Sequence, residues 1–173
     1  MTSQELIEHL ALQPHPEGGF FKETYRASDT VEYNGTARAA STAIYYLLND
    51  GAVSHLHRID ADEVWHAYAG SGLRVHIFDH DGYRFLDIGS DLKAGQSPQG
   101  LVPAGAWFGA DLLNPDDFAL VGCTVAPGFE FAHFELANLH VHVTRRTFHA
   151  QHGTALCMHA CATFDRPLSS MKR

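Results

Sequence analysis

The chain has 173 residues, of which 45% are hydrophobic, and it carries 12 Lys and Arg against 20 Asp and Glu, a formal net charge of -8. This length fits one domain, and the hydrophobic fraction is that of an ordinary folded protein. An acidic chain lacks the clustered cations that neutralise phosphates, so we expect no nucleic-acid partner. The longest uncharged apolar run near the middle, residues 43–48, is too short to span a bilayer, so we expect no membrane segment.

The cysteines and the N-terminus bear on the cellular compartment. Cys123, Cys157 and Cys161 do not form the even-numbered framework of a disulfide-rich secreted protein. Glu5 and Glu8 stand where a signal peptide has basic residues. We therefore expect reduced thiols and a cytoplasmic protein.

The first element expected is a short helix over residues 2–12. Thr2 and Glu5 have the spacing of a capping box, and the apolar residues that follow share one face. Pro14 prevents the helix from continuing.

Short strands are expected after the helix, because segments rich in aromatic and β-branched residues alternate with Gly, Pro, Asn and Asp. They predict strands over residues 20–26, 39–48, 64–69, 73–78, 83–88 and 118–125. Leu73, Val75 and Ile77 alternate with more polar residues, and Asp81-Gly82 supplies a hairpin turn. We predict a mostly-β sandwich or barrel with one leading helix.

The composition changes near residue 140. Residues 1–139 carry 7 basic and 19 acidic side chains, whereas the remainder carries 5 basic and 1 acidic. We interpret residues 1–143 as one domain and residues 144–173 as a basic, histidine-containing tail. A shifted reading frame near the end of the gene would produce such a break. The intact mass of protein from a resequenced gene tests this hypothesis, and a mass matching the present sequence would contradict it.

The strongest chemical signal is the run Ser54-His55-Leu56-His57. Alternate residues of a strand point to the same face, so both imidazoles would lie on one face, roughly 7 Å apart at the backbone. A hairpin would fold Glu63 back toward them. Two histidines and one carboxylate suit a transition metal with open coordination positions. A lone His-x-His on a strand is, however, more often a surface or hydrogen-bonded pair.

The context of this run resembles the cupin superfamily, and within it the cupin-5 group, formerly a domain of unknown function. The resemblance covers about residues 15–136. Its matching runs are residues 15–26, 41–45, 54–70, 95–99, 102–110 and 122–131. It implies a conical double-stranded β-helix, or jelly roll, with a small-molecule pocket inside the barrel, usually in a dimer.

The chain departs from the general cupin pattern at the expected metal ligands. Five residues separate His57 from Glu63, where the pattern has three or four. Phe108 stands three positions after Pro103-Ala104-Gly105, where the second motif has a histidine. The usual fourth ligand is therefore missing, which puts a four-ligand metal site in doubt.

Four further residues are predicted to contact a ligand. Glu23 shares a strand face with aromatic residues, although an exposed edge position is the commoner outcome, and Gln99 lies in a matching run. Trp107 and Phe108 would lie at the barrel mouth by resemblance, where they would stack on a flat ligand or serve equally well as core aromatics.

Three hypotheses for function follow. The first is an epimerase- or isomerase-like enzyme on a sugar-like or keto-acid molecule, with His57 or His55 as general base and a carboxylate such as Glu63 orienting it. The second is a metal-dependent oxygenase or isomerase in which His55, His57 and Glu63 bind a divalent transition metal. The third is a non-catalytic small-molecule binding protein. Metal analysis of protein purified without nickel resin distinguishes the first two.

Two further expectations concern the assembly and one variant. By resemblance, and because unpaired edge strands are a liability, we expect a homodimer. We also expect His57→Ala to abolish ligand binding or turnover with almost no change in melting temperature, because a pocket residue contributes little to the core.

Overall fold

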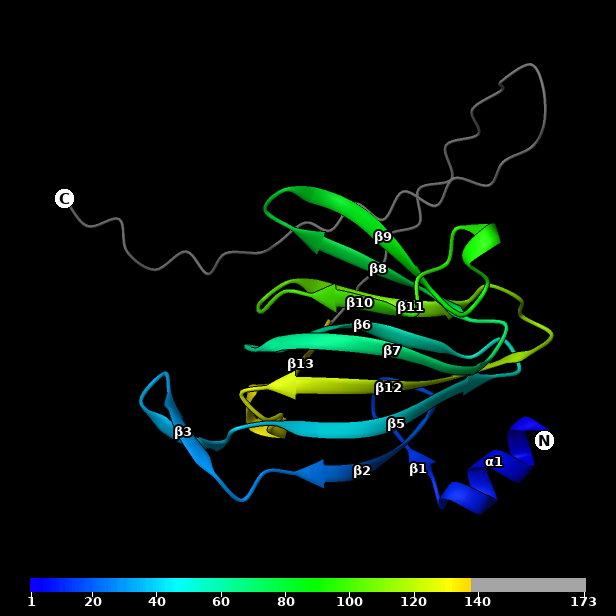
Figure 1. Ribbon diagram of the computed structural model, residues 1–173. Helices are drawn as coiled ribbons and strands as arrows, with labels where there is room; N and C mark the ends of the chain where they lie inside the picture. The colour runs from blue at the N-terminus through cyan, green and yellow to red at the C-terminus, as the bar shows by residue number, and fades with distance from the viewer. Residues whose placement is uncertain (138–173) are drawn as a thin grey trace. The chain divides into compact units, whose positions relative to one another are not determined.

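The computed structural model describes residues 1–137, in which one short helix is followed by strands (Figure 1). The tail expected over residues 144–173, and residues 138–143 of the expected domain, lie outside the described residues. The helix and the 3-10 turns are α1 (Ser3–Leu10), η1 (Leu92–Ala94) and η2 (Phe131–His133). The strands are β1 (Gln13–Pro14), β2 (Phe20–Arg26), β3 (Thr30–Tyr33), β4 (Thr36–Ala39), β5 (Thr42–Asn49), β6 (Val53–Arg58), β7 (Asp62–Gly70), β8 (Leu73–Asp79), β9 (Gly82–Ile88), β10 (Gln99–Val102), β11 (Trp107–Leu112), β12 (Phe118–Ala126) and β13 (Glu135–Leu136).

Two antiparallel sheets form the body of the fold, and their inner faces enclose the core. One sheet has the strand order β1-β2-β5-β12-β7-β10, and the other has the order β13-β6-β11-β8-β9. The hairpin β3-β4 forms a separate two-stranded sheet and projects from the end of β2 in Figure 1. This is the jelly roll that the sequence predicted.

Helix α1 begins as predicted but ends earlier. The hydroxyl of Thr2 accepts a hydrogen bond from the backbone N–H of Glu5 (3.2 Å), and the Glu5 carboxylate accepts one from the N–H of Thr2 (2.8 Å). The left-handed Ala11 (φ 52°) ends the helix, three residues before Pro14. Leu6 is buried against Leu47 of β5 and Leu120 of β12, so α1 covers part of the outer face of the first sheet.

The predicted strand pattern is confirmed where alternation or burial is strong. β2 has the predicted bounds, and β8 buries Leu73, Val75 and Ile77 on its inner face. The short strands β3, β4, β10 and β11 were not predicted from the sequence. Each has only four to six residues, too few for a clear alternation of apolar and polar side chains.

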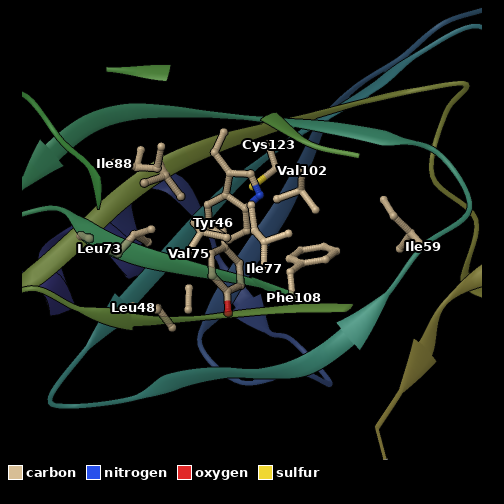
Figure 2. Packing of buried hydrophobic residues seen from close by; sticks show 14 of the residues in the cluster. Tyr46, Leu48, Ile59, Leu73, Val75, Ile77, Ile88, Val102, Phe108 and Cys123 are labelled. Atoms are coloured by element: carbon tan, nitrogen blue, oxygen red, sulfur yellow. The ribbon is translucent and has the colours of Figure 1, made fainter. Parts of the chain in front are cut away.

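The register of the central strands divides the barrel interior into two ends. At one end Ala119 of β12 pairs with Leu48 of β5, and both are completely buried. At the other end Val125 of β12 pairs with Thr42 on one side and with Glu63 of β7 on the other. Apolar side chains fill the first end, as Figure 2 shows, while polar groups collect at the second. In the part of the chain that the structure describes, no helix is long and apolar enough to cross a membrane.

Candidate functional site

The polar end of the barrel contains a pocket of about 680 Å³, a volume that includes its open mouth. Both sheets and the segment after β12 contribute to its wall. The lining side chains are His15, Glu17, Phe21, Glu23, Arg26, Thr42, Ile44, Tyr46, His57, Ile59, Glu63, Cys123, Val125, Phe129, Glu130, Phe131 and Phe134. The pocket therefore lies inside the barrel, as the resemblance implied.

A β-bulge on β6 separates the two histidines that were predicted to share a face. His57 pairs with Phe108 of β11 and Ser54 pairs with Ala110, so β6 advances three residues where β11 advances two. The extra residue turns Ser54 and His57 inward together and leaves His55 exposed. The prediction that His55 points into the barrel is therefore wrong. Of the two histidines on β6, only His57 lines the pocket.

The tight loop before β2 brings Glu17 into the pocket. The backbone N–H of His55 donates to the carbonyl oxygen of Glu17 (2.7 Å), which fastens this loop to β6. Gly18 has φ +108°, and a Cβ there would lie 2.2 Å from the carbonyl oxygen of Val53. Only glycine lets the loop approach β6 so closely, and this approach directs the Glu17 carboxyl inward.

Glu17 and His57 lie close enough to share one proton. Nδ1 of His57 lies 2.7 Å from the carbonyl oxygen of His55, and a carbonyl only accepts, so Nδ1 carries hydrogen. Nε2 lies 3.1 Å from Oε2 of Glu17, and an unprotonated Nε2 next to a carboxylate would leave two acceptors facing each other. One of the two atoms therefore holds a proton. Ser54 donates to the other oxygen, Oε1, at 3.0 Å.

Burial assigns that proton to the carboxyl group. Desolvation, together with the nearby charge of Glu63, raises the pKa of Glu17 to about 8. Desolvation lowers the pKa of His57 to about 4. Near neutral pH the pair is therefore a carboxylic acid that donates to a neutral imidazole.

A second buried carboxyl, Glu63, lines the same pocket from the start of β7. Burial raises its pKa to about 7, and a hydrogen bond with the Cys123 side chain opposes that shift. The thiol of Cys123 has its pKa raised well above the ordinary value by burial, so it stays protonated and is not a nucleophile. Among the residues that the structure describes, Glu63 makes no ion pair.

Aromatic rings form much of the remaining wall. The ring of His15 packs edge-on against Phe21 (4.5 Å between centroids) and stacks on Phe131 (6.0 Å). Nδ1 of His15 accepts from the backbone N–H of Glu17 (3.3 Å), and burial lowers the His15 pKa to about 4. The ring is therefore neutral. Phe134 packs over His57 with 5.3 Å between ring centroids.

Arg26 at the pocket mouth uses four of its five N–H groups in hydrogen bonds within the protein. Its guanidinium donates twice to Glu23 (3.1 and 2.8 Å) and once to Glu130 (2.7 Å). It also donates to the backbone carbonyl oxygen of Phe129 (3.2 Å). Two carboxylates thus surround one cation, so the mouth has an excess of negative charge.

The predicted ligand contacts have mixed outcomes. Glu23 lines the mouth as predicted, although it is also exposed. Gln99 lies on the outer face of its sheet, where it bonds the ring of His66 (2.9 Å), and Trp107 packs under the guanidinium of Arg58 (4.8 Å). Neither lines the pocket. Phe108 is completely buried beneath His57, with 4.0 Å between ring centroids, and supports that imidazole from behind.

The predicted metal ligands are not assembled. His55 is exposed, and both ring nitrogens of His57 already face protein oxygens. Within residues 1–137, the one group of three or more candidate metal-binding side chains with ligand atoms mutually within 4.8 Å is the turn Asp79-His80-Asp81, far in sequence from the pocket residues. The set of His55, His57 and Glu63 therefore does not fit a metal ion.

Sequence reasoning missed Glu17 and His15 as site residues, although both lie in the first run that resembles the family. The signal that points to them is the pair Gly18-Gly19. Adjacent glycines directly before an amphipathic strand indicate a close backbone approach, and the side chains beside such an approach are held firmly.

Comparison with known proteins gives the family. A family model described as "Cupin superfamily (DUF985)" matches residues 4–137. The chain belongs to this family. A relative from Saccharomyces cerevisiae, the uncharacterized protein YML079W, is 33% identical in an alignment 144 residues long that covers 74% of this chain and 71% of the yeast protein.

Solved structures agree with the fold. Protein SO0799 from Shewanella oneidensis is 40% identical with a TM-score of 0.73, and the match covers 79% of this chain and 85% of that one. A hypothetical protein from Leishmania major is 35% identical, also with a TM-score of 0.73, and the match covers 78% and 86%. Oxalate decarboxylase from Bacillus subtilis, at 18% identity and a TM-score of 0.52, is similar over 71% of this chain and 29% of its own length, which bears on the fold alone.

Proposed function

We propose that this cupin binds a small α-hydroxy carbonyl compound in its barrel and catalyses an isomerase-type proton transfer. The observation that carries the proposal is the protonated Glu17–His57 pair, buried in the same pocket as a second carboxyl, Glu63. A general acid and a general base work best when their pKa values lie near the operating pH. The pKa values of Glu17 (about 8) and Glu63 (about 7) satisfy this condition.

In the proposed reaction Glu63, when ionised, removes the proton on the carbon next to the substrate carbonyl. Glu17 donates its proton to the carbonyl oxygen, which gives a neutral enediol. Glu63 then returns the proton to the neighbouring carbon, while Glu17 recovers a proton from the hydroxyl that becomes the new carbonyl. The cycle consumes no net proton and needs no redox partner.

His57 is a positioning residue in this scheme. Its Nδ1–H is held by the His55 carbonyl, so its Nε2 is the acceptor that orients the acid proton on Oε2 of Glu17 until the substrate carbonyl oxygen takes that proton. The hydrogen bond from Ser54 to Oε1 fixes the orientation of the carboxyl group. The general base assigned to His57 or His55 from the sequence is thus replaced by Glu63, because the His57 nitrogens are engaged and His55 lies outside the pocket.

Solvent exchange tests the proposal. Hydroxyacetone, dihydroxyacetone and 2-hydroxyacetophenone are incubated with the protein in D₂O, and loss of the α-proton signal is followed by NMR. We expect wild type to accelerate exchange of at least one compound and Glu63→Gln to lower the rate by about 100-fold or more. Asp62→Asn is the matched control, because Asp62 is exposed on the opposite face of β7. Exchange rates with wild type and with Glu63→Gln that both equal the rate without protein would leave a binding protein, not an enzyme.

A further inference from the structure

The charges that line the pocket are unbalanced toward the negative. In the described part of the chain, Arg26 is the single pocket-lining residue with a permanently cationic side chain, and Glu23 and Glu130 already bind it. The remaining ionisable acids, Glu17 and Glu63, lie deeper and are buried. A phosphate or carboxylate that entered would lose its hydration and meet carboxyl oxygens in place of a cation.

The polar hydrogens inside the pocket are also largely committed. Ser54 donates to Glu17, and the hydroxyl of Tyr46 donates to the carbonyl oxygen of Gly18 (2.8 Å). The polar contacts that a ligand finds deep in the pocket therefore come mainly from the carboxyl groups of Glu17 and Glu63.

We propose that the pocket takes an uncharged organic molecule and excludes anions of the same shape. The body of the ligand lies against the phenyl rings of Phe21, Phe129, Phe131 and Phe134, and its one or two polar atoms bond the Glu17 and Glu63 carboxyl groups. This inference rests on the proposed function only in placing the ligand in the same pocket. The inference predicts that uncharged substrates bind in the pocket and that sugar phosphates, nucleotide sugars and keto acids do not.

Two planar molecules of nearly identical shape test it: benzamide is uncharged and benzoate is an anion. Binding to the full chain at pH 6 is measured by saturation-transfer NMR and by the shift in melting temperature, with each compound at millimolar concentration. We expect benzamide to bind with a dissociation constant at least about tenfold lower than benzoate. Phe131→Ala should weaken benzamide binding, and His55→Ala should not, because both side chains are exposed but only Phe131 lines the pocket.

Several results would overturn the proposal. Benzoate binding as tightly as benzamide would show that the pocket does not select against an anion. Benzamide binding that is unchanged in Phe131→Ala, or no binding by either compound, would show that such a ring does not enter the pocket. Selective benzamide binding together with absent solvent exchange of the α-hydroxy carbonyl compounds would support the charge selection and refute the proton transfer.

Discussion

The imidazole of His57 is held on all sides, which changes what its removal should do. It packs on Phe108 and Phe134 and bonds two protein oxygens. We expect His57→Ala to lose ligand binding and also to lower the free energy of unfolding by about 1–3 kcal/mol, because it leaves a cavity and an unpaired buried carboxyl group. The sequence alone predicted almost no loss of stability. Urea unfolding measures the difference, and a variant as stable as wild type would contradict the structure.

His55 provides the matched control for that variant. It lies two residues away on the same strand and is exposed. His55→Ala should change the free energy of unfolding by no more than about 0.5 kcal/mol and leave ligand binding intact. Equal effects of the two substitutions would mean that the bulge does not separate their side chains.

The buried acids predict how stability depends on pH. Unfolded carboxyls release their protons near pH 4.5, whereas Glu17 and Glu63 hold theirs to about pH 8 and 7 in the folded protein. The folded protein then binds more protons, so stability falls as pH rises through this range. His15 and His57, with pKa values near 4, act in the opposite direction, but only below pH 6.5, where unfolded imidazoles begin to protonate.

Above pH 6.5 the carboxyl groups therefore act unopposed by these histidines. We expect the melting temperature to fall between pH 6.5 and pH 8.5, and to fall less in Glu63→Gln, which has no proton to lose at that position. Differential scanning calorimetry across this range provides the measurement. A melting temperature that rises with pH there would have the wrong sign for buried acids.

Sequence reasoning identified some site residues and not others for a definable reason. His57, Glu63 and Glu23 were found because their types carry chemistry and they flank strands. His55 was misplaced because a period of two assumes an unbroken strand, and a bulge leaves no mark in the residues of β6 themselves. Glu17 was missed because its partner lies 40 residues away and only the fold brings them together.

At the scale of elements, the bulge of β6 is supported by a glycine on the neighbouring strand. A Cβ at Gly109 of β11 would lie 2.7 Å from the backbone carbonyl oxygen of Ser54. We expect Gly109→Ala to lower the free energy of unfolding by about 1–3 kcal/mol and to shift the NMR signals of His57. Gly51→Ala is the control for lost stability without a clash, because the backbone of Gly51 is left-handed (φ +68°) but the space around it is open. Unchanged His57 signals in Gly109→Ala would separate the bulge from the site.

The architecture was more predictable than the site, because it depends on repeated local signals. Alternation in β8, the Asp81-Gly82 turn and the Thr2 capping box each fixed one element independently. Pairing between strands distant in sequence, such as β5 with β12, is set by burial of whole faces and has no local signature. The resemblance to cupins, not the periodicity, supplied that topology.

At the scale of the whole molecule, we propose a homodimer. The outer strands β9 and β10 each end a sheet, and exposed apolar side chains lie on them: Tyr83 and Phe85 on β9 and Leu101 on β10. Such edges are commonly covered by a partner. Light scattering should give twice the chain mass at micromolar concentration, and a species of 19.1 kDa would contradict the proposal.

The protonation state of His57 tests the central claim most directly. Nitrogen-15 NMR of the imidazoles, with the His57 signals assigned by comparison with His57→Gln, reports which ring nitrogen carries hydrogen. The account predicts a neutral ring at pH 7, protonated on Nδ1 and not on Nε2, that stays neutral down to about pH 5 because its pKa is lowered to about 4. A ring protonated on both nitrogens at pH 7, or one that titrates near pH 6.5, would place the shared proton on the imidazole and leave Glu17 unable to act as the acid.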